Sequence, residues 1–219
     1  FCGAARHKLA KDFLAKGQYL KAIPAAQKAI ASYQAVGSAE EAEQGSCWIT
    51  LAEAQCQAHE MPKVQESVSQ ARAIFGGLAD VVSEAKAMGI LVKSYMQNDS
   101  PGEAVGVAKE TVTRFREAGD RPGECHALLS LAKLLLPLDP EKAEKIAVVA
   151  TGLMESLGMR EVEECRAVKA RCEHAKAASE VEATIWKRKD FLHVPRSLIV
   201  DPGGRGRLQN EFAEFAKAA

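Results

Sequence analysis

The chain has 219 residues, of which 29 are basic and 29 acidic, so it carries no formal net charge. A protein without a net positive field is a poor candidate for non-specific binding of nucleic acid. No stretch approaches the roughly 18 consecutive apolar residues that indicate a membrane-spanning helix. The sequence therefore predicts neither a nucleic-acid partner nor a transmembrane segment.

The first 35 residues have the pattern of two helices joined by a short turn. Residues 4–16 and 19–35 place apolar side chains at three- and four-residue steps, which is the spacing of one helical face. Gly17 separates the two helices, and Pro24 falls near the start of the second, where its missing N–H is least disruptive. Neither helix can bury its apolar stripe alone, so each needs neighbours of the same kind.

The same two-helix unit returns along the chain at intervals of about 40 residues. The second helices align without a gap over 21–33, 63–75, 103–115 and 142–154, ending on Tyr33, Phe75, Phe115 and Met154. The first helices of the later pairs are expected at about 39–58, 80–97 and 122–136. Turn glycines follow the second helices at each unit except one, where Ala79 takes the position. This repetition predicts an all-α solenoid of antiparallel helix pairs.

A last helix of the first kind is expected at about 160–178, and its many charged residues suit a cap on the stack. The composition changes after Ser179. The sequence therefore predicts a helical-repeat domain over 1–178 and a C-terminal extension over 179–219.

The extension is expected to contain an extended strip at 198–200 and a short final helix, whose apolar stripe includes Phe212 and Phe215. Such a helix is too short to be stable alone, so it must dock on something. In one interpretation the extension folds back along the solenoid and its aromatic residues join the core. In the other it reaches outward and anchors the protein in a larger assembly.

The first pair of helices resembles a tetratricopeptide repeat. The matching residues are Leu9, Ala10, Phe13, Gly17, Tyr19, Ala22, Ala26 and Ala29, and parts of the pattern recur to about residue 178. The long period resembles the repeats of G-protein-regulator and kinesin-light-chain scaffolds. This resemblance implies a right-handed superhelix whose concave face is lined by the first helix of each pair and holds a peptide or helix of a partner protein.

One well-known version of this fold clamps the C-terminal carboxylate of a partner with Lys and Asn side chains. Lys8 stands at the position of the first such Lys, but Asp12 occupies the position of the Asn. A carboxylate there would repel an incoming carboxylate. The sequence therefore argues against this kind of clamp.

No arrangement of residues indicates a reaction, a cofactor or a metal site. Cys125 and His126 are adjacent, and adjacent residues on a helix point about 100° apart, so they do not readily share one ion. Neither a nucleophile elbow nor a phosphate loop is visible. The six cysteines are far apart, and most of them are expected to be reduced core thiols, which suits an intracellular, cytoplasmic protein. The interior of a chloroplast or mitochondrion, after removal of a targeting peptide, is the alternative.

The sequence thus predicts a non-catalytic scaffold, an accessory or structural subunit that holds other proteins in a complex. A regulatory or substrate-recruiting repeat domain of a larger enzyme is the alternative. Candidate partner-binding residues are polar positions on the first helices and aromatic positions in the extension: Lys8, Asp12, Glu53, Gln57, Lys93, Gln97, His126, Lys133, Trp186, Phe191, Phe212 and Phe215.

Overall fold

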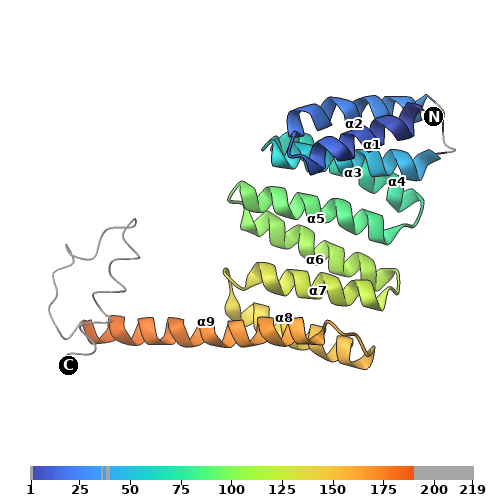
Figure 1. The fold of residues 1–219 in the computed structure, drawn as a ribbon. Coiled ribbons are helices and arrows are strands. Elements are labelled where there is room, and N and C mark those ends of the chain that lie inside the picture. The colour runs from blue at the N-terminus through green and yellow to red at the C-terminus, as the bar shows by residue number, and fades with distance from the viewer. Residues whose placement is uncertain (1, 36, 38–39, 190–219) are drawn as a thin grey trace. The chain divides into compact units, whose positions relative to one another are not determined.

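A computed structural model describes residues 2–35, 37 and 40–189, and over these residues the chain forms nine helices (Figure 1). In chain order they are α1 (Cys2–Ala15), α2 (Tyr19–Gln34), α3 (Glu41–Gln57), α4 (Met61–Gly77), α5 (Val81–Gln97), α6 (Pro101–Glu117), α7 (Arg121–Leu135), α8 (Pro140–Ser156) and α9 (Val162–Lys189). The predicted all-α repeat architecture is confirmed, and α1 to α8 match the expected ranges to within a few residues.

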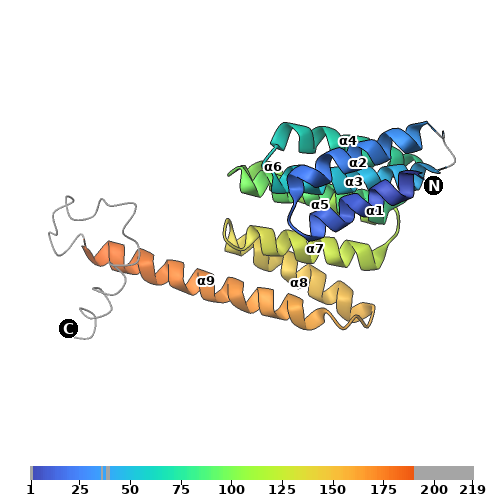
Figure 2. The same cartoon turned by 45° about the horizontal axis from the view of Figure 1, so that its top comes forward.

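Each helix from α1 to α7 packs against the next one in the chain, as Figures 1 and 2 show. Among the first helices of the pairs, α3 also contacts both α1 and α5. We call α1, α3, α5 and α7 the first-helix layer. Most of the buried side chains are small, including Ala22, Ala52, Ala104 and Ala143 at the helix contacts. Small residues allow close packing of helices along their length.

Most of the turns between helices share one geometry, in which a residue with positive φ follows the helix. These residues are Gly17, His59, Ala79, Asp99, Gly119 and Gly158. The amide after each bonds back to a carbonyl five residues earlier, as in Asp120 N to Phe115 O at 3.0 Å and Asp80 N to Phe75 O at 3.0 Å. This is the Schellman pattern of helix termination. Ala79 thus adopts the left-handed conformation, with φ of 56°, that its repeat partners reach with glycine.

Several of the helices that follow such turns are capped by an aspartate. The side chain of Asp80 accepts a hydrogen bond from the amide of Ser83 at 3.0 Å, and Asp120 accepts one from Gly123 at 2.9 Å. These carboxylates satisfy amides that have no partner inside the helix. The turn residue and the cap therefore lie next to each other, and only three residues separate α4 from α5 and α6 from α7.

Helix α9 is longer than the sequence suggested, because it continues to Lys189 instead of ending at Ala178. Neither Gly nor Pro occurs between Gly158 and Pro195, and the segment is rich in Ala, Glu and Lys, which favour helix. The chain divides into two units, residues 1–173 and 174–219, and α9 begins in the first and ends in the second. The predicted domain border after residue 178 stays a prediction. The expected strip at 198–200 and the short final helix lie outside the described residues.

Candidate protein-binding surface

Eight of the predicted partner-binding residues lie on the first-helix layer. They are Lys8 and Asp12 on α1, Glu53 and Gln57 on α3, Lys93 and Gln97 on α5, and His126 and Lys133 on α7. Gln57 is partly buried and the other seven are exposed. Trp186 falls within α9, whereas Phe191, Phe212 and Phe215 lie outside the described residues. The positions on α1 to α7 are therefore accessible to a partner, and their role in binding stays a prediction.

The structure brings part of this set together where α3 meets α5. The thiol of Cys56 donates to Oε1 of Gln97 at 3.2 Å. The side chain of Glu53 is exposed, but partial loss of water around its carboxyl raises the pKa of that group. The positive charges of Lys93 and Lys11 act in the opposite direction. Glu53, Lys93 and Lys11 thus form a charged neighbourhood across α1, α3 and α5. Lys11 was not among the predicted residues.

The two predicted residues on α7 lie in different settings. Lys133 Nζ forms an ion pair with Glu164 Oε1 of α9 at 2.6 Å, and both side chains are exposed. His126 lines a cleft of about 630 Å³. The ion pair holds Lys133 toward α9, so His126 is the predicted residue that takes part in a concave site.

The cleft lies between α5 and α7 and has α6 as its floor. Its lining residues are Val82, Ala85, Lys86, Gly89 and Val92 of α5, Ala108, Thr111 and Phe115 of α6, Pro122, Gly123, His126, Ala127, Ser130 and Leu134 of α7, and the cap Asp120. Most of these side chains are apolar or small. Clefts with an apolar lining and few polar groups are typical binding sites.

The aromatic ring at the end of α6 contacts a different helix pair than the equivalent rings of the first two pairs do. In the first two pairs, the ring at the end of the second helix lies against a glycine of the same pair, Tyr33 on Gly3 and Phe75 on Gly45. The equivalent ring of the third pair, Phe115, lies against Gly123 of the following pair. A Cβ at Gly123 would overlap this ring, so the glycine is needed for the contact. Phe115 therefore bridges α6 and α7, at the end of the cleft where α7 begins.

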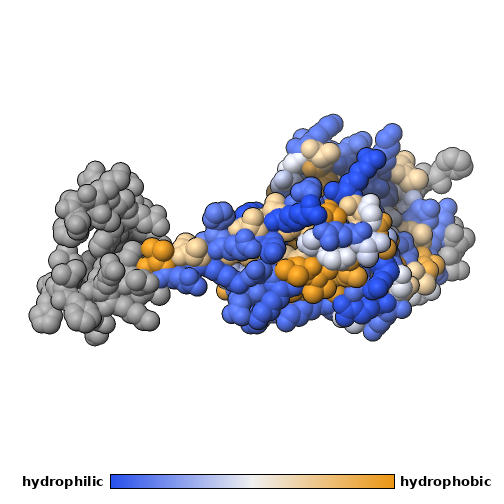
Figure 3. Space-filling view, turned by 90° about the horizontal axis from the view of Figure 1, so that it is seen from below, coloured by the Kyte–Doolittle hydropathy of each residue, from blue (hydrophilic) through white to orange (hydrophobic). Residues whose placement is uncertain are grey.

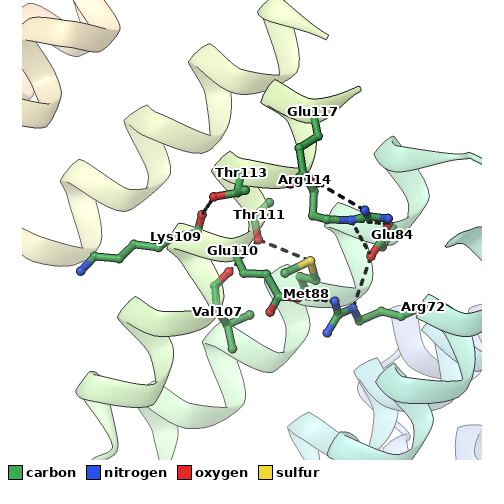
Figure 4. Close-up of polar contacts among 10 residues, drawn as sticks. All are labelled: Arg72, Glu84, Met88, Val107, Lys109, Glu110, Thr111, Thr113, Arg114 and Glu117. Carbon is green, nitrogen blue, oxygen red and sulfur yellow. Dashed lines mark hydrogen bonds and ion pairs between the residues drawn. The ribbon is translucent and has the colours of Figure 1, made fainter. Parts of the chain in front are cut away.

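A buried carboxylate joins the helices on one side of the cleft (Figure 4). Glu84, in the first turn of α5, is 4% exposed. Arg114 Nη2 of α6 donates to its Oε2 at 2.8 Å, and Nε of Arg72 from α4 lies 3.5 Å from its Oε1. Arg72 also pairs with Glu110 of α6. Glu84 thus connects α4, α5 and α6 through two arginines.

Glu124 repeats this arrangement forty positions later, in the first turn of α7. It is 1% exposed, and its oxygens accept hydrogen bonds from Arg116 Nε at 2.8 Å and Arg121 Nη1 at 3.3 Å. Burial alone would raise the pKa of the Glu124 carboxyl, but Arg116 and then Arg121 outweigh it and lower that pKa. Both acids were missed in the sequence, although Asp80-x-x-x-Glu84 returns there as Asp120-x-x-x-Glu124.

The face of the molecule on the side of α8 and α9 is largely hydrophilic and carries a hydrophobic patch (Figure 3). Among the exposed large apolar side chains, α8 contributes Val148 and Val149, and Leu157 follows at its C-cap. Within the described part of the chain, no helix is long and apolar enough to cross a membrane. Nor do three or more His, Cys, Asp or Glu side chains of residues 2–35, 37 and 40–189 gather so that they could hold a metal ion.

No protein-family model and no curated protein matches the sequence. Solved structures do match. The chain is similar to the TPR-like repeats of a kinesin light chain from Podosopora anserina, with 17% identity, a TM-score of 0.59, and 84% of this chain and 91% of that chain covered. The fold is a tetratricopeptide-like α-solenoid.

Two further structures share this tetratricopeptide-like fold. The apo form of RapI has 11% identity and a TM-score of 0.66, and the match covers 100% of this chain and 84% of RapI. A signal transduction ATPase with numerous domains from Pyrococcus horikoshii, which has a tetratricopeptide repeat sensor, has 18% identity and a TM-score of 0.62. That match covers 81% of this chain but 27% of the ATPase. Tetratricopeptide-like folds generally mediate protein–protein interaction and are usually non-catalytic.

Proposed function

We propose that this protein is a non-catalytic interaction scaffold, an accessory or structural subunit of a multiprotein complex that binds partners through its first-helix layer and its C-terminal extension. The observation that carries the proposal is the apolar cleft between α5 and α7, which opens on the layer where the predicted partner-binding residues lie. The general role of tetratricopeptide-like folds supports it.

The proposal is tested by purifying the tagged chain from its own cells under mild conditions and measuring the native mass of the purified complex. We expect a complex with defined partners at fixed ratios, identified by mass spectrometry. The tag alone, expressed at the same level, is the control. A chain that elutes as a lone monomer at every salt concentration would exclude the scaffold.

The role of the extension is tested with a chain that ends at Lys189, which leaves α9 complete. If the extension is an anchor, the shortened chain melts at the same temperature and loses partners. If the extension belongs to the fold of its own chain, the melting temperature falls. A shortened chain that keeps both its stability and its partners would remove the extension from the proposal.

A regulatory or substrate-recruiting domain of a larger enzyme is the second candidate, and one observation favours it. The ATPase from Pyrococcus horikoshii has a repeat sensor, and this chain matches 27% of its length. An antibody against the repeat domain separates the two candidates. It would precipitate from cell extracts a polypeptide that also carries a catalytic domain if the second candidate holds, and one without such a domain if the scaffold holds, with mass spectrometry as the readout.

A further inference from the structure

The first helix pair is rich in exposed cations. Residues 2–35 contain six basic residues and one acidic residue, so the pair has a net charge of +5 in a chain that has none. Helix α3 has the opposite balance, because residues 40–57 hold four acidic residues and no basic one. Charge is thus strongly separated at the N-terminal end of the stack (Figure 1). The six cations, all exposed, are Arg6, Lys8, Lys11, Lys16, Lys21 and Lys28.

Four of these cations share the face of α1 and α2 that is turned away from α3. Along α1, positions 6, 9, 13 and 16 follow one another at three- and four-residue steps, which places their side chains on one side of the helix. His7, whose Nε2 lies 3.0 Å from Thr50 Oγ1, marks the side of α1 that meets α3. On α2, Lys21 and Lys28 are seven residues apart and also lie on one side.

Two contacts join these side chains of α1 and α2 into one surface. Nη1 of Arg6 donates to Oγ of Ser32 and to the carbonyl oxygen of Lys28. Nζ of Lys21 lies 6.0 Å from the centroid of the Phe13 ring. We call this surface the N-terminal end face, and it consists of Arg6, Leu9, Phe13, Lys16, Lys21 and Lys28.

No carboxylate of the described residues forms an ion pair with a cation of the N-terminal end face. Inside the stack, by contrast, small residues such as Ala52 and Ala104 lie where helices meet, and the buried Glu84 is paired with arginine. A face with four exposed cations is therefore unlike the contacts between repeats, and it fits an anionic surface.

The composition of the face favours a lipid surface over an acidic protein or a nucleic acid. Three of its four cations are lysines, which are flexible point charges, whereas specific pairing with carboxylates relies on the planar fork of arginine. Leu20, next to Lys21 in the first turn of α2, is 78% exposed and is the most exposed large apolar side chain of the described residues. An apolar side chain beside lysines can enter the headgroup layer of a membrane, whereas a phosphate backbone gains nothing from it.

We infer that the N-terminal end face binds the surface of an anionic membrane. Leu20 enters the headgroup layer, and the lysines of the face meet acidic headgroups. Binding of this kind scales with the buried apolar area and with the attraction between lysines and anionic lipids. The inference goes beyond the proposed function, because it adds a lipid surface to the protein partners and does not depend on the cleft.

The test is flotation of the intact chain with large vesicles of phosphatidylcholine that contain about 30% phosphatidylserine, compared with vesicles of phosphatidylcholine alone. We expect binding to the anionic vesicles only, and loss of that binding as the salt concentration rises from about 50 to about 500 mM. The double variant Lys21→Glu, Lys28→Glu should lower the partition coefficient about tenfold or more. Leu20→Ser, which changes no charge, should lower it about threefold or more.

Matched controls change the same residue types elsewhere. Lys86→Glu together with Lys109→Glu reverses two exposed lysines of α5 and α6, and Leu138→Ser changes an exposed leucine of the turn before α8. Both controls should bind within about twofold of the natural chain. All the substituted side chains are exposed, and thermal denaturation checks that each variant is folded.

Equal binding to neutral vesicles, absence of binding at low salt, or a charge-reversed variant that binds as well as the natural chain would overturn the inference. Duplex DNA and polyglutamate are offered to the chain at the same salt concentration. If either is bound more tightly than the anionic vesicles, or if Leu20→Ser has no effect, the face recognises anionic polymers and not a membrane. Each of these results leaves the proposed scaffold standing, because the native purification tests it separately.

Discussion

The first-helix layer is closed in its N-terminal half and open in its C-terminal half. In the closed half α3 contacts both α1 and α5, and the rings of Tyr33 and Phe75 lie on glycines of their own pairs. In the open half α6 joins α5 to α7, and Phe115 lies on the next pair. One repeat pattern thus gives two different surfaces.

The charges differ between the halves as well. Helices α1 and α3 present both signs, with Lys8, Lys11, Asp12 and Glu53 all exposed. Helices α5 and α7 bury their acids and expose their bases. Among the residues that line the cleft, Lys86 and Asp120 carry opposite charges. The open half therefore differs from the closed half at this place by its apolar cleft and not by a net charge of the cleft lining.

The largest effect is expected from Glu84→Ala, which removes the carboxylate shared by Arg72 and Arg114. Breaking a buried ion pair costs about 3–5 kcal/mol, and because Arg114 is 38% exposed, we expect about 2–3 kcal/mol here. Urea denaturation measures the loss. Glu141→Ala, which removes an exposed ion pair with Lys145 on α8, is the control and should change stability by less than about 1 kcal/mol. Equal losses in the two variants would contradict the role given to Glu84.

A second comparison sets Gly45→Ala against Gly123→Ala. A Cβ at either position would overlap a phenylalanine ring, Phe75 or Phe115. Overpacking costs about 1–3 kcal/mol, and Gly45→Ala should fall at the upper end because Phe75 is fully enclosed. Gly123→Ala should cost less, because Phe115 lines the cleft and has room to move. Thermal denaturation measures both.

The exposed Gly106→Ala, where nothing approaches the new Cβ, should instead stabilise the chain by about 0.5–1 kcal/mol. If Gly123→Ala is the more costly of the two overpacked variants, the ring of Phe115 does not have room to move into the cleft.

The two halves should also respond to acid at different pH. Burial, and then the charge of Lys11, lower the pKa of His7, whose Nε2 lies 3.0 Å from Thr50 Oγ1. Below about pH 6.5, His7 binds a proton more readily in the unfolded chain than in the folded chain. The free energy of unfolding therefore decreases as the pH falls below this value. The pKa of Glu124 is also lowered in the fold, and the stability this provides is present above about pH 4.5 and is lost as pH falls through the folded-state pKa.

Denaturation midpoints measured from pH 8 to pH 3 separate these two contributions. His7→Gln should flatten the decline just below pH 6.5, and Glu124→Gln should flatten the decline below about pH 4.5 while lowering stability at neutral pH. A profile that keeps its shape in either variant would show that the named residue does not control that part of the curve.

The smallest effect concerns the turns, which are alike in both halves. Ala79 has φ of 56°, a conformation that glycine adopts without strain, so Ala79→Gly should raise stability by about 0.5–1 kcal/mol. Gly119→Ala, at the equivalent turn and with open space around its Cβ, should lower stability by about the same amount. Calorimetry detects both changes. Two changes of the same sign would mean that strain at the turn is not the cause.

The helices and their period could be predicted because apolar spacing and turn residues are local signals. The end of α9 was predicted too early, although the absence of Gly and Pro before Pro195 was visible in the sequence. The cleft could not be predicted, because it depends on how α5, α6 and α7 pack together, and local apolar spacing does not report that packing. Glu84 and Glu124 were overlooked because acidic residues are rarely buried without a partner, and three of their arginine partners, Arg72, Arg114 and Arg116, lie on other helices.

Methyl NMR of the intact chain titrated with a partner protein identified in the native purification tests the central claim most directly. If the cleft is the binding site, the largest shift changes fall on the methyl groups of Val82, Val92 and Leu134, and Gly89→Leu abolishes them while Gly106→Leu does not. Largest changes on Ile23 and Ile30 of the closed half, or on Val148 and Val149 of α8, would contradict the account.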